Sequence, residues 1–191
     1  MADALEAALL RLECLVTALL ILASGESTPV HEDVLLVPLI EDILMDLRPI
    51  SSTQGVQVSY VAAEQLIVSG DPDLLRRAFQ NLVENAIRCN RPGGTVTISM
   101  RRLDAGVVVE VAETGIGIPP TALPHIFERF YRVEQSRSRH RGGAGLGLAL
   151  AREIARRHGG DILVESRLER QVGAGRLASE SALPSREARG R

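Results

Sequence analysis

Apolar residues recur along the chain with a period of three to four, and this period predicts its helices. Residues 3–23 carry leucine and valine at spacings of four and three, a heptad seam suited to pairing with another helix. The members of the seam are Leu5, Leu9, Leu12, Val16 and Leu19. Further helices are predicted over residues 38–47, between two prolines, over residues 72–89 and over residues 146–157.

β-branched residues gather in short runs that predict the strands. These runs cover residues 56–61, 65–68, 96–100, 107–112 and 161–164. Asp104-Ala105-Gly106 predicts a hairpin turn between the third and the fourth run. A short apolar run, residues 126–131, predicts a small aromatic helix inside an otherwise polar loop. Together the helices and strands predict a two-layer α/β sandwich preceded by a single helix.

The length of 191 residues suits one full-sized domain with a short helical appendage. We expect the appendage to cover residues 1–28 and the domain to cover residues 29–184, with a lid at about 119–144. Residues 176–183 are predicted to form an irregular edge strand, and residues 185–191 a disordered tail.

Composition narrows the class of protein. Aromatic residues make up 3% of the chain and Trp is absent, so Leu, Val, Ile and Ala must build the core. The 22 basic residues, all of them Arg, nearly balance the 24 acidic ones, which gives no signal for direct nucleic-acid contact or membrane insertion. The most apolar stretch, residues 15–23, is far shorter than the roughly 20 residues that span a bilayer. Cys14 and Cys89 have no metal-like spacing, so we expect a reduced, cytoplasmic protein.

Asn81 and Asn85 lie four residues apart on the predicted helix 72–89, so they share one face. Two amides on one face can offer carbonyl oxygens to Mg²⁺, which needs only one or two protein oxygens besides water and phosphate. A solvated polar stripe is the alternative interpretation of this pair.

Glu113-Thr114-Gly115-Ile116-Gly117 follows a predicted strand. An acid before Gly-x-Gly would let the backbone approach a flat ligand while the carboxylate accepts a hydrogen bond from an amino group. Thr114 adds a hydroxyl beside that carboxylate. An ordinary tight turn is the alternative interpretation.

Glycines at positions 142, 143, 145 and 147 open the predicted helix 146–157. Backbone N–H groups at such a helix start can point at phosphates, and the helix dipole favours their negative charge. The spacing fits neither a P-loop nor a dinucleotide-binding fingerprint, because position 148 is Leu and the chain has no Lys. A hinge before the helix is the alternative. The arginine-rich run 137–141 beside these glycines also favours phosphate contact.

These segments, in this order and at these spacings, resemble the N, G1, F and G2 boxes of bacterial sensor histidine kinases, which share the Bergerat-type ATPase fold. Asp71-Pro-Asp-Leu-Leu-Arg-Arg-Ala-Phe-Gln-Asn-Leu-Val-Glu-Asn-Ala-Ile-Arg is similar to the family's N-box helix, and His158-Gly-Gly-Asp-Ile-Leu-Val-Glu-Ser to its closing strand. The resemblance covers about residues 34–166. It implies a kinase that uses ATP and Mg²⁺ and transfers the γ-phosphoryl group to a histidine.

The resemblance also implies roles for single residues. Asn85 would hold Mg²⁺, with Asn81 at the neighbouring position and Arg88 as a phosphate contact. Glu113 would bind the adenine amino group where the family usually has Asp, so the pocket must accommodate one more methylene. The other nucleotide contacts would be Thr114, Gly115, Gly117, Phe127, Phe130, Arg132, Gly143, Gly145, Leu146 and Gly147.

The family's phosphoacceptor is a histidine followed by an acid on the first helix of a dimerising hairpin, whereas residues 5–24 resemble the second helix. His31 is one alternative acceptor, although it falls in a predicted linker. We therefore expect the acceptor on a partner chain, or on the missing part of the same kinase, with a response regulator receiving the signal. The heptad seam could also pair two copies of this chain into a homodimer. Two other functions stay open: a degenerate module that docks without catalysis, and an anti-sigma-type Ser/Thr kinase on the same fold.

Overall fold

The strongest amphipathic pattern of the sequence becomes α3 (Pro72–Arg88) in the computed structural model, which describes residues 32–62, 64–103, 106–133 and 145–166. Asp71 caps the helix, because its Oδ1 accepts hydrogen bonds from the backbone N–H groups of Asp73 and Leu74, each at 3.0 Å. Pro72 occupies the first turn, where its missing N–H has no partner to lose. The stripe that α3 buries consists of Leu75, Ala78, Phe79, Leu82, Val83, Ala86 and Ile87.

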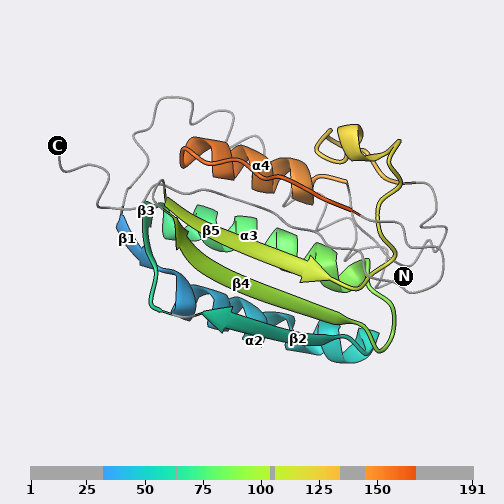
Figure 1. Ribbon diagram of the computed structural model, residues 1–191, viewed down its shortest axis with the longest axis horizontal. Coiled ribbons are helices and arrows are strands. Elements are labelled where there is room, and N and C mark those ends of the chain that lie inside the picture. Colours follow the sequence, from blue (N-terminus) through green and yellow to red (C-terminus); the bar gives the residue numbers. More distant parts are fainter. Residues whose placement is uncertain (1–31, 63, 104–105, 134–144, 167–191) are drawn as a thin grey trace, which may run out of the picture.

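The strands form two sheets (Figure 1). They are β1 (Glu32–Leu35), β2 (Gln57–Ala62), β3 (Ile67–Gly70), β4 (Thr95–Leu103) and β5 (Gly106–Glu113). β4 lies between β2, its parallel partner, and β5, its antiparallel partner, and β1 pairs with β3. The predicted hairpin is confirmed, since Leu103 pairs with Gly106. β1 was not predicted, and β3 begins two residues later than expected, because each of these short strands exists through pairing with the other.

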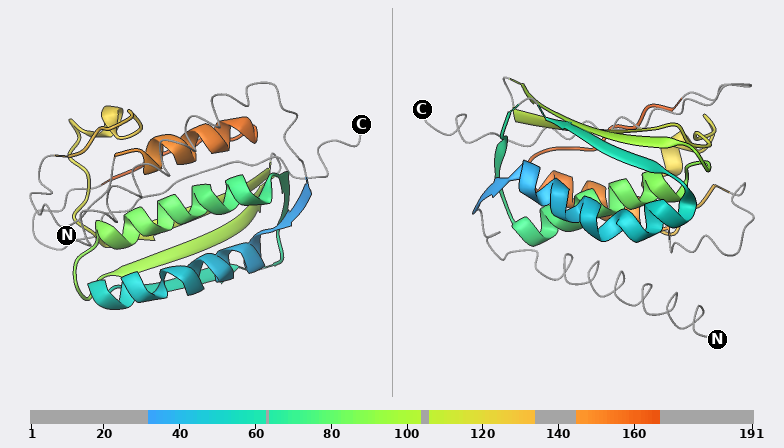
Figure 2. Two further views of the ribbon diagram at one scale, coloured as in Figure 1. Left: turned by 180° about the vertical axis from the view of Figure 1, so that it is seen from behind. Right: turned by 90° about the horizontal axis from the view of Figure 1, so that it is seen from below.

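Three helices cover one face of the three-stranded sheet (Figure 2). They are α2 (Leu36–Gln54), α3 and α4 (Gly147–Arg157). α3 lies between α2 and α4 and contacts both. Ile43, Val83, Ile98 and Ile154, one from each helix and one from β4, are fully buried between the layers. The predicted two-layer α/β sandwich is therefore confirmed.

α2 is longer than the helix predicted for residues 38–47. It continues through Pro49 to Gln54 and is capped by Gly55, whose φ of +65° is the left-handed conformation that glycine tolerates. The expectation that this proline ends the helix is wrong. Because Leu47 and Ser51 continue the buried stripe on either side of it, packing outweighs the one backbone hydrogen bond that the proline cannot donate.

Two predicted elements do not form. Residues 161–164 are not a strand: the N–H of Ile162 donates to the side chain of Asp161 at 2.8 Å, which withdraws it from a sheet ladder. Residues 126–131 form turns rather than a small helix, after the 3₁₀ helix η1 (Leu123–His125). Phe130 has a φ of +68°, which no right-handed helix accommodates.

Several expectations lie outside the described residues. These are the helix of residues 3–23, the edge strand of residues 176–183, the tail, His31, Gly143 and the arginine-rich run 137–141. None of the helices that the structure describes is long and apolar enough to cross a membrane.

Candidate functional site

α3 and α4 are joined where α3 begins. His158, buried at the end of α4, accepts from the N–H of Asp71 through Nε2 at 3.0 Å and donates through Nδ1 to the Ile154 carbonyl at 2.8 Å. Because one ring nitrogen accepts and the other donates, the ring is neutral with its proton on Nδ1. Gly70 leaves room for the ring, since a Cβ there would lie 2.5 Å from His158 Cδ2. This histidine staple holds together the helices that carry the amide and glycine motifs.

Asn81 lies on α3 opposite the first residue of α4. A Cβ added to Gly147 would lie 3.2 Å from Asn81 Oδ1, so the bare glycine allows the two helices to approach closely here. Asn81 Nδ2 is buried and has no hydrogen-bond partner among the described residues. Buried amide donors are normally paired, so this one is available to a group that the described residues do not supply.

Asn85 and Arg88 follow on the next turn of α3. The Cys89 thiol approaches Asn85 Oδ1 at 3.7 Å, a weak contact that leaves this amide oxygen with capacity to accept. Arg88 is engaged more strongly, because its Nε donates to Glu84 Oε1 at 2.7 Å. To contact a phosphate as expected, Arg88 would have to share or leave this ion pair.

Glu113 is the last residue of β5, and its side chain is 5% exposed. Its Oε2 is buried with no hydrogen-bond partner among the described residues. Burial therefore raises the pKa of Glu113 to about 8, because the charged form loses its hydration without gaining donors. The carboxyl is an unsatisfied polar group at the end of a strand, where the sequence predicts a ligand.

The hydroxyl of Thr114 supports the turn beside Glu113. Its Oγ1 accepts from the N–H of Thr95 at 2.8 Å, and the buried Asn90 donates through Nδ2 to the Thr95 carbonyl at 2.9 Å. These bonds tie the end of β5 to the start of β4. The ligand contact expected of Thr114 stays a prediction, while its hydroxyl is occupied by backbone.

The glycines of the same segment have separate reasons to be glycine. A Cβ on Gly115 would lie 2.6 Å from the Cys89 carbonyl oxygen and 2.9 Å from Glu113 Oε1, so the bare backbone lets the end of α3 meet the end of β5. The N–H of Ile116 donates to the same carbonyl at 3.1 Å. Gly117 has a φ of +70°. The sequence explains these glycines by access for a flat ring, and the structure adds close packing at Gly115.

The aromatic segment and the glycine segment meet through the backbone. Phe130 donates its N–H to the Gly145 carbonyl at 2.8 Å, and a Cβ on Gly145 would lie 2.8 Å from the Tyr131 carbonyl oxygen. Leu146 is buried, whereas Phe130 and Arg132 are exposed. The predicted F-box and G2-box segments are therefore neighbours in space, as Figure 1 shows for the yellow segment and the start of α4.

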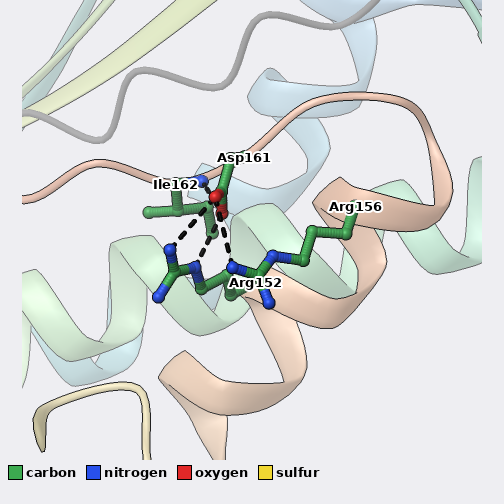
Figure 3. A network of polar contacts seen from close by, with 4 residues as sticks. All are labelled: Arg152, Arg156, Asp161 and Ile162. Carbon is green, nitrogen blue, oxygen red and sulfur yellow. Dashed lines mark hydrogen bonds and ion pairs between the residues drawn. The ribbon is translucent and has the colours of Figure 1, made fainter.

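Phe127 connects this region to an ion-pair network on α4. The Arg152 guanidinium lies 4.5 Å above the Phe127 ring centroid, a cation–π contact. The same guanidinium donates to both carboxylate oxygens of Asp161, at 2.7 and 3.0 Å, and Arg156 adds a donor at 3.4 Å (Figure 3). The side-chain hydrogen bond from Arg152 holds the pKa of Asp161 well below its usual range, assisted by the backbone N–H of Ile162.

Sequence reasoning missed Asn90, Arg152, Asp161 and the Cys89 carbonyl. Asn90 sits in a turn-rich run that favours loop structure by composition alone, and no sequence signal marks a backbone carbonyl as an anchor. Arg152 and Asp161 are nine residues apart across the end of α4, beyond the three- and four-residue spacings that suggest helix ion pairs.

The residues present fit a purine nucleotide with a divalent cation. Glu113 offers a buried carboxyl for the base, Asn81 an unpaired donor, and Asn85 an amide oxygen. The described residues contain no group of three or more His, Cys, Asp or Glu side chains that could hold a metal. A cation at this site would therefore depend on amide oxygen, water and ligand phosphates, the coordination that suits Mg²⁺.

Much of this chain is similar in sequence to segments of known sensor kinases. The chain is 37% identical over 162 residues to the sensor histidine kinase RppB of Synechocystis sp., which covers 83% of this chain and 36% of RppB. It is 43% identical over 121 residues to the sensor protein VanS of Enterococcus faecium, covering 63% of this chain and 31% of VanS. The chain thus spans about a third of the length of the curated relatives that it matches.

A solved structure and a family model extend this likeness. The mycobacterial sensor histidine kinase MprB superposes with a TM-score of 0.70 at 30% identity, covering 82% of this chain and 99% of that one. The model of the histidine kinase-, DNA gyrase B- and HSP90-like ATPases matches residues 70–177, more than half of the chain and all four motif segments. The chain belongs to this ATPase family, in its histidine kinase branch.

Proposed function

We propose that this chain is the ATP-binding catalytic part of a two-component sensor histidine kinase. One observation carries the proposal: the two buried side-chain polar atoms without a hydrogen-bond partner among the described residues are Asn81 Nδ2 and Glu113 Oε2. Both belong to residues that the sequence nominates for nucleotide binding. Unpaired buried polar atoms destabilise a fold, so their presence in the motif residues supports completion by a polar ligand.

The residues divide the work of holding the nucleotide. Glu113 would contact the adenine amino group, and the backbone N–H groups at the start of α4, at Gly145 and Gly147, would face the phosphates. Asn85 would offer its amide oxygen to Mg²⁺, which neutralises the charge that develops on the phosphate oxygens during transfer. Asn81 would donate its unpaired N–H to the same polar surroundings.

The proposed reaction moves one phosphoryl group. The bond between the γ-phosphorus and the oxygen that bridges to the β-phosphate breaks, and a bond between phosphorus and an imidazole nitrogen of the acceptor histidine forms. ADP leaves with the electron pair of the broken bond, and the imidazole releases its N–H proton to solvent. Positioning and charge neutralisation supply most of the catalysis in such transfers, which suits a site built from amides, glycines and a helix start.

The proposed activity needs two partners: a segment that carries the acceptor histidine, and a response regulator. The matched segment makes up only about a third of each of these sensor kinases, which supports a dimerising, histidine-bearing segment elsewhere in such a kinase as the place of transfer. A response regulator would then receive the phosphoryl group.

Labelled ATP tests this function. The chain is incubated with ATP labelled at the γ-phosphate and Mg²⁺, alone and with a histidine-bearing dimerisation segment of a sensor kinase. We expect label on the histidine segment that acid removes and alkali leaves in place. Asn85→Ala should reduce the transfer by about a hundredfold or more, because the cation loses its protein ligand. Gln80→Ala, another amide on α3 outside the motif, serves as the matched control and should transfer normally.

Three other results would contradict the proposal. An acid-stable phosphoprotein would indicate a Ser or Thr kinase on the same fold. Nucleotide binding without transfer to any histidine segment would indicate a docking module. No nucleotide binding at all, in a chain shown to be folded by circular dichroism, would remove the ATP-dependent function altogether.

A further inference from the structure

The carboxyl of Glu113 is buried, and the neighbours that the structure gives it are uncharged. Its side chain is 5% exposed, and on β4 its register partner is Val96. Oε1 lies 2.9 Å from the place that a Cβ of Gly115 would take, and the Cys89 carbonyl oxygen lies 2.6 Å from the same place. Oε2 has no donor among the described residues. A carbonyl oxygen and an unpaired oxygen atom give no support to a negative charge.

The titratable groups near Glu113 do not stabilise a negative charge on its carboxyl either. From the end of α3 the neighbouring residue is Cys89, whose thiol is directed at Asn85, and Arg88 is paired with Glu84. β4 presents Thr95 and Val96, and residues 114–118 have no titratable side chain. Burial is the cause that raises the pKa of Glu113, with no charged neighbour contributing. Isolated carboxylates are costly in such surroundings, and the group neutralises instead.

We propose that Glu113 binds the purine ring as an uncharged carboxylic acid, accepting from the exocyclic amino group through one oxygen and donating its own proton to ring nitrogen N1 through the other. This inference rests on the proposed nucleotide function and deepens it. A neutral acid carries one acceptor and one O–H donor side by side. The adenine edge carries the complementary amino donor and N1 acceptor, so both positions are satisfied at once.

A charged carboxylate would recognise the same edge differently. Both of its oxygens are acceptors, so one would accept from the amino group while the other faced the N1 lone pair without a proton between them. The two protonation states therefore differ in the hydrogen bond that they make to N1, which only the neutral acid can donate. Comparing ATP with an analogue that lacks N1 therefore tests whether Glu113 carries a proton when the base is bound.

ATP and its 1-deaza analogue, in which a C–H group replaces N1, form the test pair. The two share their phosphates, so the ratio of their dissociation constants cancels the titration of phosphates and of more distant protein groups. The ratio is measured by isothermal titration calorimetry at about pH 6.5 and about pH 9.5, on either side of the pKa of about 8. The proteins are the unaltered chain, Glu113→Gln and, as a matched control on the opposite face of β5, Glu110→Gln.

The proposal predicts that ATP binds about five- to tenfold more tightly than the analogue at the lower pH, the strength of one hydrogen bond. This preference narrows at the higher pH in the unaltered chain and in Glu110→Gln. In Glu113→Gln it persists at both pH values, because the amide carries a permanent donor beside its acceptor.

Two outcomes would overturn the inference while leaving the proposed function intact. The first is a preference for ATP that is the same at both pH values in the unaltered chain. The second is a folded Glu113→Gln that binds ATP but shows no preference over the analogue. If neither nucleotide binds the unaltered chain at either pH, the proposed function itself fails.

Discussion

Glu113 and Asp161 are two carboxyl groups of one domain in opposite environments. Asp161 accepts from both Arg152 donors, from Arg156 and from the N–H of Ile162, although its side chain is 39% exposed. Glu113 is nearly inaccessible, yet one of its oxygens has no donor among the described residues. The two acids therefore differ in what their hydrogen bonds do. Those of Asp161 hold the fold together, whereas Glu113 is left with a bond that a ligand can make.

The two acids also couple to folding with opposite signs. The lowered pKa of Asp161 means that its contribution to stability is present above the unfolded value of about 3.9 and is lost as the pH falls below it. The raised pKa of Glu113 means that the folded chain keeps a proton which the unfolded chain has released. Stability therefore falls as the pH rises from about 4.5 to about 8, and is level beyond.

Glu113→Leu should give the largest effect, because it removes the carboxyl that we assign to ligand binding. Nucleotide affinity should fall by about 3 kcal/mol, more than a hundredfold, because the base loses its hydrogen-bonding partners in a buried place. Stability should rise by about 1–2 kcal/mol, because the unpaired oxygen is gone. That gain should be larger at about pH 8 than at about pH 6, given the direction of the Glu113 titration. Calorimetry measures the affinity, and urea unfolding at the two pH values measures the stability.

A matched control isolates the position. Glu110→Leu lies on the same strand with its side chain on the other face, and should leave nucleotide affinity within about twofold of the unaltered chain. If Glu113→Leu destabilised the fold at every pH instead of stabilising it, Glu113 would be a structural residue and the contrast with Asp161 would be lost.

Gly70→Ala should damage the architecture while sparing the ligand site. The added Cβ would lie 2.5 Å from His158 Cδ2 and 2.9 Å from Leu75 Cδ1. The ring cannot turn away without giving up a hydrogen bond at each nitrogen, so we expect a loss of about 2 kcal/mol in unfolding free energy. Thermal denaturation measures it, with Ser69→Ala as the neighbouring control. Unchanged stability would mean that the two hydrogen bonds of His158 contribute little to the stability of the fold.

Much of the architecture follows from local patterns that are visible in the sequence. α3 combines a capping Asp71, a proline in its first turn and an unbroken apolar stripe, so propensity, capping and burial agree. The hairpin between β4 and β5 follows from a turn signal between two β-branched runs. Elements that depend on partners far along the chain were not predictable in this way. β1 exists through β3, and α2 runs past Pro49 because of the core that it covers.

The candidate site shows the same limit. The sequence marks Asn81, Asn85 and Glu113 by type and spacing, and these are the residues with unpaired or weakly engaged polar atoms. It does not reveal that Thr114 is occupied by the backbone of Thr95, since that bond joins two strands. Nor does it reveal the charge state of Glu113, because burial is a property of the assembled fold and not of the motif.

Asp161→Asn should give the smallest effect, and it tests whether the ion pairs of Asp161 stabilise the fold. Asparagine keeps an oxygen for the N–H of Ile162 but loses the ion pair with Arg152. Because the two side chains are 28% and 39% exposed, solvent screening limits the expected loss to about 0.5–1 kcal/mol near neutral pH. The loss should be smaller at about pH 3, because the unfolded chain takes up a proton there while the lowered pKa keeps folded Asp161 charged. Urea unfolding at both pH values measures it, with the exposed Glu165→Gln as control. An equal loss at both pH values would show that hydrogen-bond geometry and packing, rather than charge, give Asp161 its role, and that the contrast between the two acids is not electrostatic.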